Sequence, residues 1–246
     1  MRTAVEKPRK QIYSNYTEED FTVWKLLYEK QMRNLKGKVV DEFIAGIELL
    51  DFKSGEIPNF EKVNEKLLDL TGWSIKTVPN LAAVDLFFEQ LSKRHFTSTC
   101  WLRSMEEFDY LEEPDMFHDV FAHVPMLCNK KYTDFFHKIG ELATSLKDEK
   151  AIKMLQRLYW YTIEFGLLQA EDDLKIYGAG IISSVGEINN VYSKTAQIKP
   201  FNIEEVLHTP FEIDRVQPLY FSITSFDELI EAFEQIEKHF KTYLNA

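Results

Sequence analysis

Two short segments of the chain place ionisable side chains where a folded protein normally has only apolar ones. In the first, His118 and His123 stand among phenylalanine, valine and methionine residues. In the second, Glu164 is the single charged residue between Leu158 and Leu168. A buried carboxylate is costly unless it is paired, protonated or bound to a metal. Two histidines and one carboxylate are the ligands of a mononuclear metal site with open positions, so the fold must bring both segments together.

Each of these residues also has an ordinary explanation. A lone histidine on an apolar face is usually a hydrogen-bonded core residue, and Glu164 would equally suit a buried salt bridge with an arginine or lysine. On a straight α-helix, residues five apart point about 140° away from each other, so His118 and His123 would converge only near a helix end. Pro125 supplies such an end, because a proline disfavours helical backbone at the residue before it, near Val124.

The ligand types alone leave the metal open. Catalytic zinc in some proteases is held by the pattern H-E-x-x-H, whereas the spacing here is one residue longer and Asp119 stands in place of the glutamate. Two histidines and a carboxylate with room for oxygen are typical of non-haem Fe(II) oxygenases. A zinc-dependent hydrolase is the second hypothesis. A helical binding protein that keeps an aromatic pocket without chemistry is the third.

Charge and composition exclude several function classes. The net charge of −11 argues against nucleic-acid binding as the main role, because affinity for phosphate backbones comes from clustered lysine and arginine. No apolar run approaches the roughly 18 residues of a membrane span, and the basic N-terminus is not followed by the apolar region of a signal peptide. Cys100 and Cys128 are too few for a disulfide framework, which favours a reducing compartment. We therefore expect a cytoplasmic protein without nucleic-acid or membrane partners.

Helical periodicity predicts a mainly α fold, a single domain of packed helices with a few short β-strands near the site. Residues 1–16 are polar and are expected to form a mobile tail or draped arm, and residues 17–246 the domain. Thr17 and Asp20 predict the start of the first helix, which reaches about Gly37. Further helices are expected from Phe43 to Leu50, Asn59 to Gly72, Asn80 to just before Phe96, Asp134 to Leu146, Glu149 to Leu168, Val185 to Tyr192, and after Ser225. Strand-like runs are Thr97 to Arg103 and Pro218 to Thr224.

Four motifs follow one another in the chain: Phe108 to Asp119, His123 to Pro125, Leu158 to Leu167, and Tyr177 to Ser184. In spelling and order they resemble the pterin-dependent aromatic amino acid hydroxylase family, most closely its bacterial phenylalanine 4-hydroxylase members. The resemblance runs from about Trp73 to Ser225, which is most of the chain.

The resemblance implies an enzyme, a monooxygenase that hydroxylates L-phenylalanine to L-tyrosine with O2 and a tetrahydropterin, either tetrahydrobiopterin or a related compound. It implies that His118, His123 and Glu164 are the catalytic metal ligands and hold Fe(II). Its partners would be these small molecules alone. The animal enzymes add a regulatory domain and a tetramerising helix for which this chain has no room, so we expect an unregulated, monomeric catalytic domain.

On the substrate side, the resemblance assigns Arg103 to the amino acid carboxylate, a role that suits a bidentate guanidinium. The residues themselves offer Asp115 as an ion-pair partner of Arg103, a role that can hold together with carboxylate binding, and the resemblance places Ser183 near the metal. Trp160 would form the wall against the substrate ring and favour phenylalanine or tyrosine over tryptophan. The ordinary alternatives are an arginine paired only with aspartate, a helix-capping serine and a core tryptophan.

On the pterin side, the resemblance assigns Phe87 and Tyr159 to stacking, Leu81 to lining the pterin, and Glu187 to a position near it. Core packing is the alternative for the first three, and a solvated helix face for Glu187. One departure from the family stands beside the second histidine, where Ala122 replaces the usual glycine. A methyl group there would crowd the site if the backbone φ were positive.

Overall fold

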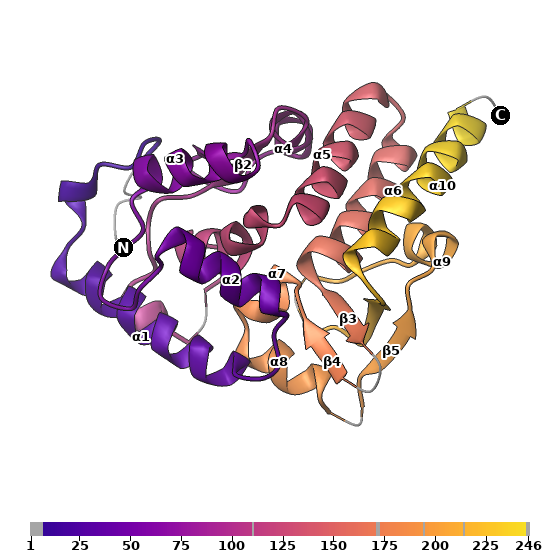
Figure 1. The fold of residues 1–246 in the computed structure, drawn as a ribbon. Coiled ribbons are helices and arrows are strands. Elements are labelled where there is room, and N and C mark those ends of the chain that lie inside the picture. The colour runs from indigo at the N-terminus through magenta and orange to yellow at the C-terminus, as the bar shows by residue number, and fades with distance from the viewer. Residues whose placement is uncertain (1–6, 110, 171–172, 194, 214, 245–246) are drawn as a thin grey trace.

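The fold is described from a computed structural model over residues 7–109, 111–170, 173–193, 195–213 and 215–244 (Figure 1). Residues 1–6 of the expected tail lie outside the described residues. The α-helices are α1 (Glu18–Leu35), α2 (Asp41–Leu50), α3 (Phe60–Leu70), α4 (Val84–Ser92), α5 (Lys130–Ser145), α6 (Glu149–Tyr159), α7 (Ala179–Ile182), α8 (Val185–Val191), α9 (Ile203–His208) and α10 (Phe226–Leu244). The strands are β1 (Ser74–Thr77), β2 (His95–Ser98), β3 (Gly166–Ala170), β4 (Asp173–Ile176), β5 (Gln197–Pro200) and β6 (Leu219–Ile223). The mainly α fold with a few short strands is therefore confirmed.

Helix starts are set by side chains that satisfy the first free backbone N–H groups. At α1 the Thr17 hydroxyl accepts from the Asp20 N–H, and the Asp20 carboxylate accepts from the Thr17 N–H at 2.7 Å. At α3 the Asn59 side chain accepts from the Glu61 and Lys62 N–H groups. Asn129 caps α5, which therefore starts earlier than expected. The helices predicted after Asn59, Phe43, Val185 and Ser225 are confirmed as α3, α2, α8 and α10.

Two expected helices have the wrong bounds. The helix expected from Asn80 begins only at Val84, so Leu81 lies in the preceding loop. The helix expected to reach Leu168 ends at Glu164, because the chain turns at Gly166 into strand β3. A side chain at Gly166 would come within 2.1 Å of the Thr162 carbonyl oxygen, so glycine permits the tight turn. The apolar residues after Glu164 are buried by sheet pairing, which a helical pattern does not distinguish.

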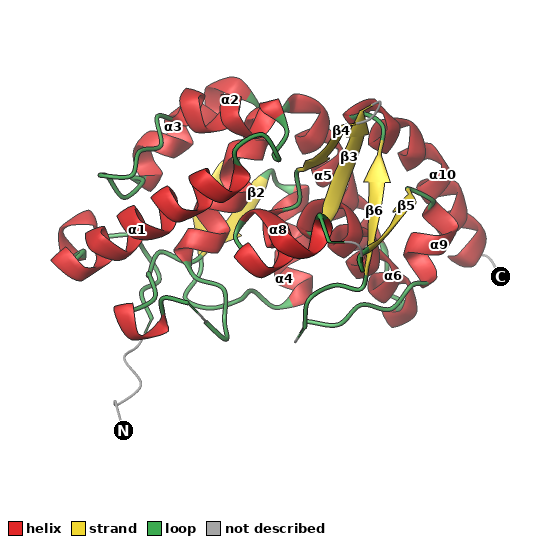
Figure 2. Cartoon of the chain, turned by 90° about the horizontal axis from the view of Figure 1, so that it is seen from below, coloured by secondary structure: helices red, strands yellow, loops and turns green. Residues whose placement is uncertain are grey.

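The strands form two separate sheets (Figure 2). β1 and β2 pair in parallel, and the strand expected at Thr97 to Arg103 is displaced to His95–Ser98. The larger sheet has the order β4-β3-β6-β5, with β3 antiparallel to β4 and parallel to β6. Since β3 begins at Gly166, two residues after Glu164, its pairing with β6 fixes where that carboxylate lies.

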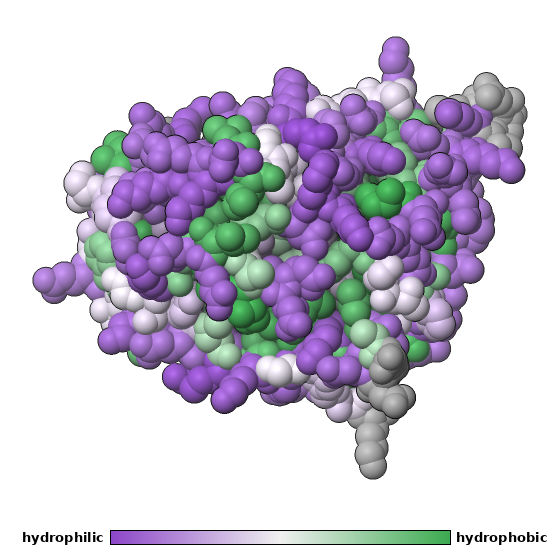
Figure 3. All heavy atoms as spheres, viewed as in Figure 1, coloured by the Kyte–Doolittle hydropathy of each residue, from purple (hydrophilic) through white to green (hydrophobic). Residues whose placement is uncertain are grey.

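Helices α4, α5 and α10 pack side by side and bury large aromatic residues between them (Figure 1). Phe135 of α5 meets Phe233 of α10 edge to face at 6.2 Å. The surface in Figure 3 is mainly hydrophilic, and apolar side chains reach it in separate patches. None of the described helices combines the length and the apolarity that a membrane span requires.

The described part of the expected tail packs on the domain. The Gln11 side chain donates to the Pro58 carbonyl at 2.9 Å and accepts from the Phe60 N–H at 2.8 Å. The Tyr16 hydroxyl donates to the Cys100 carbonyl at 2.8 Å. These contacts tie residues 11–16 to the segments before α3 and after β2. The boundary drawn between tail and domain at residue 17 stays a prediction.

Replacing Gly46 by alanine is expected to destabilise the fold strongly. An added Cβ at Gly46 of α2 would lie 2.1 Å from the Pro125 carbonyl oxygen, which is backbone and cannot rotate away. We expect a loss of about 2–3 kcal/mol in the free energy of unfolding, measured by urea denaturation. At Gly55 an added Cβ meets nothing within 4 Å, so Gly55→Ala should change stability by less than about 0.5 kcal/mol. Equal stability of the two variants would contradict the packing of α2 on this turn.

Candidate metal centre

The histidine pair lies on a π-helical segment, Phe117–His123. The α-helical geometry assumed from the sequence is wrong here. In a π-helix the hydrogen bond joins residues five apart, so His118 and His123 come onto the same face. Their ring centroids are 5.0 Å apart. The helix end expected at Val124 is wrong, because Val124 keeps helical backbone and the chain continues through Pro125 as a 3-10 helix, Val124–Cys128. The described non-glycine residues with positive φ are Asp51 and Arg94, so Ala122 fits an ordinary backbone.

Glu164 ends a second π-helical segment, Trp160–Glu164, which continues α6. This one extra residue per turn brings the hydroxyl of Tyr159, five residues back, to within 2.8 Å of the Glu164 carboxylate, to which it donates. Both halves of the centre therefore use the same helix variant. π-helical turns are rare and occur often at functional sites.

Three ligand atoms, one each from His118, His123 and Glu164, converge within 4.8 Å of one another. His123 Nε2 lies 3.2 Å from one oxygen of the carboxylate, and His118 Nε2 lies 3.8 Å from the other. The two Nε2 atoms are 3.3 Å apart. Within the described residues, the salt bridges of Glu164 are to these histidines, so the expected alternative of an arginine or lysine partner is wrong.

The tautomer of His118 leaves a nitrogen lone pair facing the centre. The Ser183 hydroxyl donates to the Ala179 carbonyl at 3.0 Å, so its oxygen accepts from His118 Nδ1 at 2.9 Å. Nε2 of His118 then carries no proton and faces Glu164. Burial lowers the pKa of His118 to about 4, against the opposing effect of the carboxylate, so the ring is neutral at pH 7. Ser183 thus orients a ring, and the helix-capping role is taken instead by Ser184 of α8.

The electrostatics of Glu164 suit a cation. Burial by itself would raise the pKa of its carboxyl group, but the His123 and His118 rings and the Tyr159 hydrogen bond lower it to about 2. His123 is 2% exposed and lies against the ring of Phe96, with centroids 4.8 Å apart. A carboxylate and two imidazole nitrogens in a buried space are the donor set of a divalent transition metal, so the residues fit such an ion.

Arg103 and Asp115 form a buried pair next to the centre. Arg103 Nε and Nη2 donate to the two carboxylate oxygens, each at 2.9 Å, and the Arg103 N–H adds a third bond at 3.0 Å. The His118 N–H donates to the same carboxylate at 3.3 Å. Asp115 is therefore the partner expected for Arg103, and it connects the guanidinium to the backbone that carries a histidine.

A cavity of about 60 Å³ opens at the three converging side chains. Leu81, Phe87 and Tyr159, the residues assigned to the pterin side, line it together with the histidines and Glu164. Phe87 and Tyr159 meet edge to face at 5.1 Å, and Leu81 is 75% exposed. The further lining residues are Val78, Asn80, Ala82, Phe96, Thr97, Thr99, Pro114 and Asp119.

Asp119 is a cavity residue that the sequence reasoning missed. Its carboxylate accepts from the Thr99 N–H at 2.7 Å and from the Thr99 hydroxyl at 3.0 Å. Burial raises the pKa of Asp119 to about 7, despite the opposing hydrogen bonds from Thr99. Its place directly after His118 was the available signal, because a charged residue there shares the apolar surroundings of the histidine.

Five of the assigned residues do not line this cavity. Arg103, Asp115 and Ser183 bond to one another or to His118 beside it, whereas Trp160 and Glu187 make their contacts elsewhere. Trp160 packs between the rings of Phe211 and Phe165. Glu187 is 6% exposed and bonded within the protein, so the solvated helix face offered as its alternative is wrong. The structure therefore groups the metal ligands with Leu81, Phe87 and Tyr159, but it does not bring Glu187 to the cavity.

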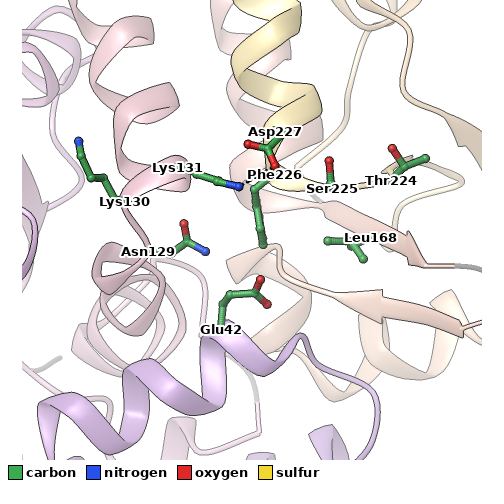
Figure 4. Close-up of a pocket in the computed structure, with 9 residues that line it drawn as sticks. All are labelled: Glu42, Asn129, Lys130, Lys131, Leu168, Thr224, Ser225, Phe226 and Asp227. Carbon is green, nitrogen blue, oxygen red and sulfur yellow. Dashed lines mark hydrogen bonds and ion pairs between the residues drawn. The ribbon is translucent and has the colours of Figure 1, made fainter.

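A larger hollow of about 550 Å³ lies elsewhere, at the starts of α5 and α10 (Figure 4). Lys130 and Lys131 line it, but each is paired with an aspartate, Asp134 and Asp227 respectively. In the described part of the chain, the side chains placed to share a metal ion are those of His118, His123 and Glu164, and none of them lines this hollow. The small cavity is therefore the candidate site.

The comparisons with known proteins agree with this geometry. Residues 6–246 match the family model of the biopterin-dependent aromatic amino acid hydroxylases. A phenylalanine-4-hydroxylase of Chromobacterium violaceum is 43% identical over 218 residues, which are 88% of this chain and 73% of that protein. One of Ralstonia nicotianae is 40% identical over 220 residues, 88% of this chain and 70% of that protein.

Solved structures of the Chromobacterium violaceum enzyme share the fold. The crystal structure with bound oxidized Fe(III) aligns with a TM-score of 0.87 at 41% identity, covering 92% of this chain and 82% of that one. A second, with iron(III) and the oxidized cofactor 7,8-dihydrobiopterin, also has a TM-score of 0.87 at 41% identity, covering 92% and 83%.

Proposed function

Because the chain belongs to the biopterin-dependent aromatic amino acid hydroxylase family, we propose that it hydroxylates L-phenylalanine to L-tyrosine with O2 and a tetrahydropterin at a mononuclear Fe(II) site. The observation that carries the proposal is the convergence of His118, His123 and Glu164 within 4.8 Å. Family membership argues against the zinc hydrolase. The assay of tyrosine formation separates the enzyme from a binding protein without chemistry. The bound iron in the relative supports iron as the metal.

In this proposal His118, His123 and Glu164 hold the iron, which when bound supplies the activation of O2 with electrons from the pterin. The surrounding protein groups orient the ligand side chains and exclude water. Ser183 fixes the tautomer of His118, and Tyr159 fixes the rotamer of Glu164 through its hydroxyl. Such partners of the ligands tune metal affinity. The aromatic wall of Phe96 against His123 keeps bulk water from the centre.

We propose that Arg103 binds the carboxylate of the amino acid. Two of its nitrogens are taken by Asp115, whereas Nη1 makes only a long contact of 3.5 Å to the Phe108 carbonyl. The guanidinium therefore keeps donors for an incoming carboxylate, while Asp115 holds its plane fixed. The pair serves both as the structural ion pair and as the recognition group.

We propose that the pterin lies against Phe87 and Tyr159, with Leu81 at the mouth. The cavity of about 60 Å³ admits an ion with one or two waters but not a bicyclic ring, so pterin binding requires side chains at the mouth to move. The exposure of Leu81 supports this, because its side chain has few neighbours to hold it.

The proposed reaction is tested by incubating the purified protein with L-phenylalanine, tetrahydrobiopterin, O2 and Fe(II), and measuring tyrosine by chromatography. Tyrosine formation that needs all four components is the expected result. The same protein loaded with Zn(II) is the control and should form none. Failure to form tyrosine at full iron occupancy would overturn the proposal, and hydroxylation of tyrosine or tryptophan instead would reassign the substrate.

Replacing Tyr159 by phenylalanine is expected to weaken metal binding about tenfold or more, because Glu164 loses the hydroxyl that holds it at 2.8 Å. The affinity is measured by competition of Fe(II) or Co(II) with a chelator. Tyr192→Phe is the control, since its hydroxyl bonds the Leu174 carbonyl and its ring is 42% exposed. Unchanged affinity in Tyr159→Phe would show that the hydroxyl does not support the ligand.

We further propose that the chain acts as a monomer in the cytoplasm. The described structure has both cysteines, Cys100 and Cys128, as free thiols, which suits a reducing compartment. The monomer stays a prediction, and sedimentation of the purified protein at several concentrations tests it.

A further inference from the structure

Trp160 is the centre of a stack of three aromatic rings. Its ring lies nearly parallel to Phe211, with centroids 4.3 Å apart and an angle of 13°, and it faces Phe165 at 4.6 Å. Phe165 in turn lies against Gly180, where an added Cβ would come within 2.7 Å of the ring. The stack thus runs from the loop after α9 to the turn that carries Ser183, the partner of His118.

Gln217 fixes the edge of the Trp160 ring. The indole Nε1–H donates to Gln217 Oε1 at 3.1 Å, and Gln217 is 3% exposed. The Gln217 amide nitrogen donates to the carbonyls of Glu212 and Arg215, at 2.8 and 3.1 Å. Both the oxygen and the nitrogen of the Gln217 amide therefore have hydrogen-bond partners. Its two bonds to Glu212 and Arg215 also hold the preceding loop beside the tryptophan.

Glu187 and Asn190 of α8 hold the backbone of Gln217 from both sides. One Glu187 oxygen accepts from the Gln217 N–H at 3.0 Å, and the other accepts from the Tyr220 hydroxyl. The Asn190 side chain donates to the Gln217 carbonyl at 2.8 Å and to the Tyr220 hydroxyl at 2.7 Å. Both oxygens of the Glu187 carboxylate are thus used inside the protein. Burial raises the pKa of this carboxyl group, so only these donors keep an ionised form there.

We propose that Gln217, clamped by Glu187, is a positioning residue that fixes the plane of Trp160 and thereby sets which aromatic side chain the substrate site accepts. Glu187 acts on the substrate side through Gln217, in place of the pterin contact that the family resemblance assigned to it. The inference rests on the proposed function, in which Trp160 forms the wall against the substrate ring. A ring that tilts when its indole bond is lost gives a looser wall, which penalises phenylalanine more than the larger tryptophan.

The kinetic test compares Gln217→Met with the wild type. We expect KM for phenylalanine to rise about fivefold, the worth of one buried hydrogen bond, and the preference for phenylalanine over tryptophan to fall. KM for the pterin should change by less than about twofold. Gln235→Met, exposed on α10, is the matched control and should match the wild type. A rise in the pterin KM alone would overturn the inference.

A double-mutant cycle isolates the bond between Trp160 and Gln217. Trp160→Phe has no indole N–H, so adding Gln217→Met in that background should change KM by less than about twofold. An equal fivefold effect in both backgrounds would mean that Gln217 acts only on its own loop, and the positioning role would be wrong.

A third measurement is independent of hydroxylation. The indole N–H signal of Trp160 in an ¹⁵N spectrum is identified by its loss in Trp160→Phe, and its exchange with solvent is followed by saturation transfer. We expect slow exchange in the wild type, faster exchange in Gln217→Met and Glu187→Ala, and recovery in Glu187→Gln, which keeps an acceptor for the Gln217 N–H. If exchange is unchanged in both Gln217→Met and Glu187→Ala, the proposal that Glu187 and Gln217 fix the Trp160 ring is wrong. This measurement tests whether Glu187 and Gln217 hold the Trp160 ring even if the wild type forms no tyrosine. The absence of tyrosine would overturn only the proposed function.

Discussion

Replacing His118 by alanine is expected to abolish both iron binding and tyrosine formation. His118 supplies one of three ligand atoms, and its loss leaves His123 and Glu164, which lie 3.2 Å apart, without the third donor. Removing a partner of a ligand typically costs 10- to 100-fold, so loss of a ligand itself should lower affinity for Fe(II) by more than about 100-fold. Iron content after gel filtration is measured by elemental analysis, and tyrosine by chromatography.

His208→Ala is the matched control for this variant, because His208 is exposed on α9 and lies outside the centre. It should keep iron and activity. Circular dichroism checks that His118→Ala remains folded, since the removed side chain is 19% exposed but also bonds Ser183 at the end of α7. A folded His118→Ala protein that retains stoichiometric iron would reject the ligand assignment.

Replacing Arg103 by methionine is expected to cost about 3–5 kcal/mol of stability, because it leaves the buried carboxylate of Asp115 without its cation. Asp115 is 0% exposed and takes two side-chain bonds from Arg103 at 2.9 Å. The free energy of unfolding is measured by urea denaturation. Activity should be lost as well, because the same guanidinium is proposed to bind the substrate carboxylate.

Two further variants separate charge from size at this pair. Arg33→Met, at an exposed position of α1, should be nearly neutral in stability. Asp115→Asn combined with Arg103→Met removes the unpaired charge and should recover part of the stability but none of the substrate binding. If the double variant is no more stable than Arg103→Met, the buried charge is not the cause of the loss.

The side chains of the centre could be predicted from the sequence, but the backbone conformation that brings them together could not. Isolated charges in apolar runs identify His118, His123 and Glu164, because burial of such groups requires a compensating partner. Their helical spacing, however, suggested divergence, since a periodic pattern assumes the α-helix and gives no sign of an inserted π-turn. The extension of α6 to Leu168 failed for a related reason: apolar residues on all sides describe a buried helix and a buried strand equally well.

Local motifs also could not reveal partners that come from distant elements. Thr99, which holds Asp119, and Gln217, which holds Trp160, are ordinary polar residues in the sequence. Only the packed structure shows that they bond the Asp119 carboxylate and the Trp160 indole. Glu187 is the opposite case, because its position in a family motif suggested a cofactor contact, whereas its carboxylate is occupied by Gln217 and Tyr220.

The two π-helical segments, Phe117–His123 and Trp160–Glu164, have a consequence for how such a centre arises and is lost. A π-turn is an α-helix that has gained one amino acid, so a one-codon deletion in either segment would restore regular helical bonding and turn one of the three converging side chains about 100° around the helix axis, away from the other two. The same deletion would give the backbone regular α-helical hydrogen bonds and separate the three side chains that form the centre. Relatives that keep the same chemistry should therefore keep the length of these two segments more strictly than the identity of most residues around them.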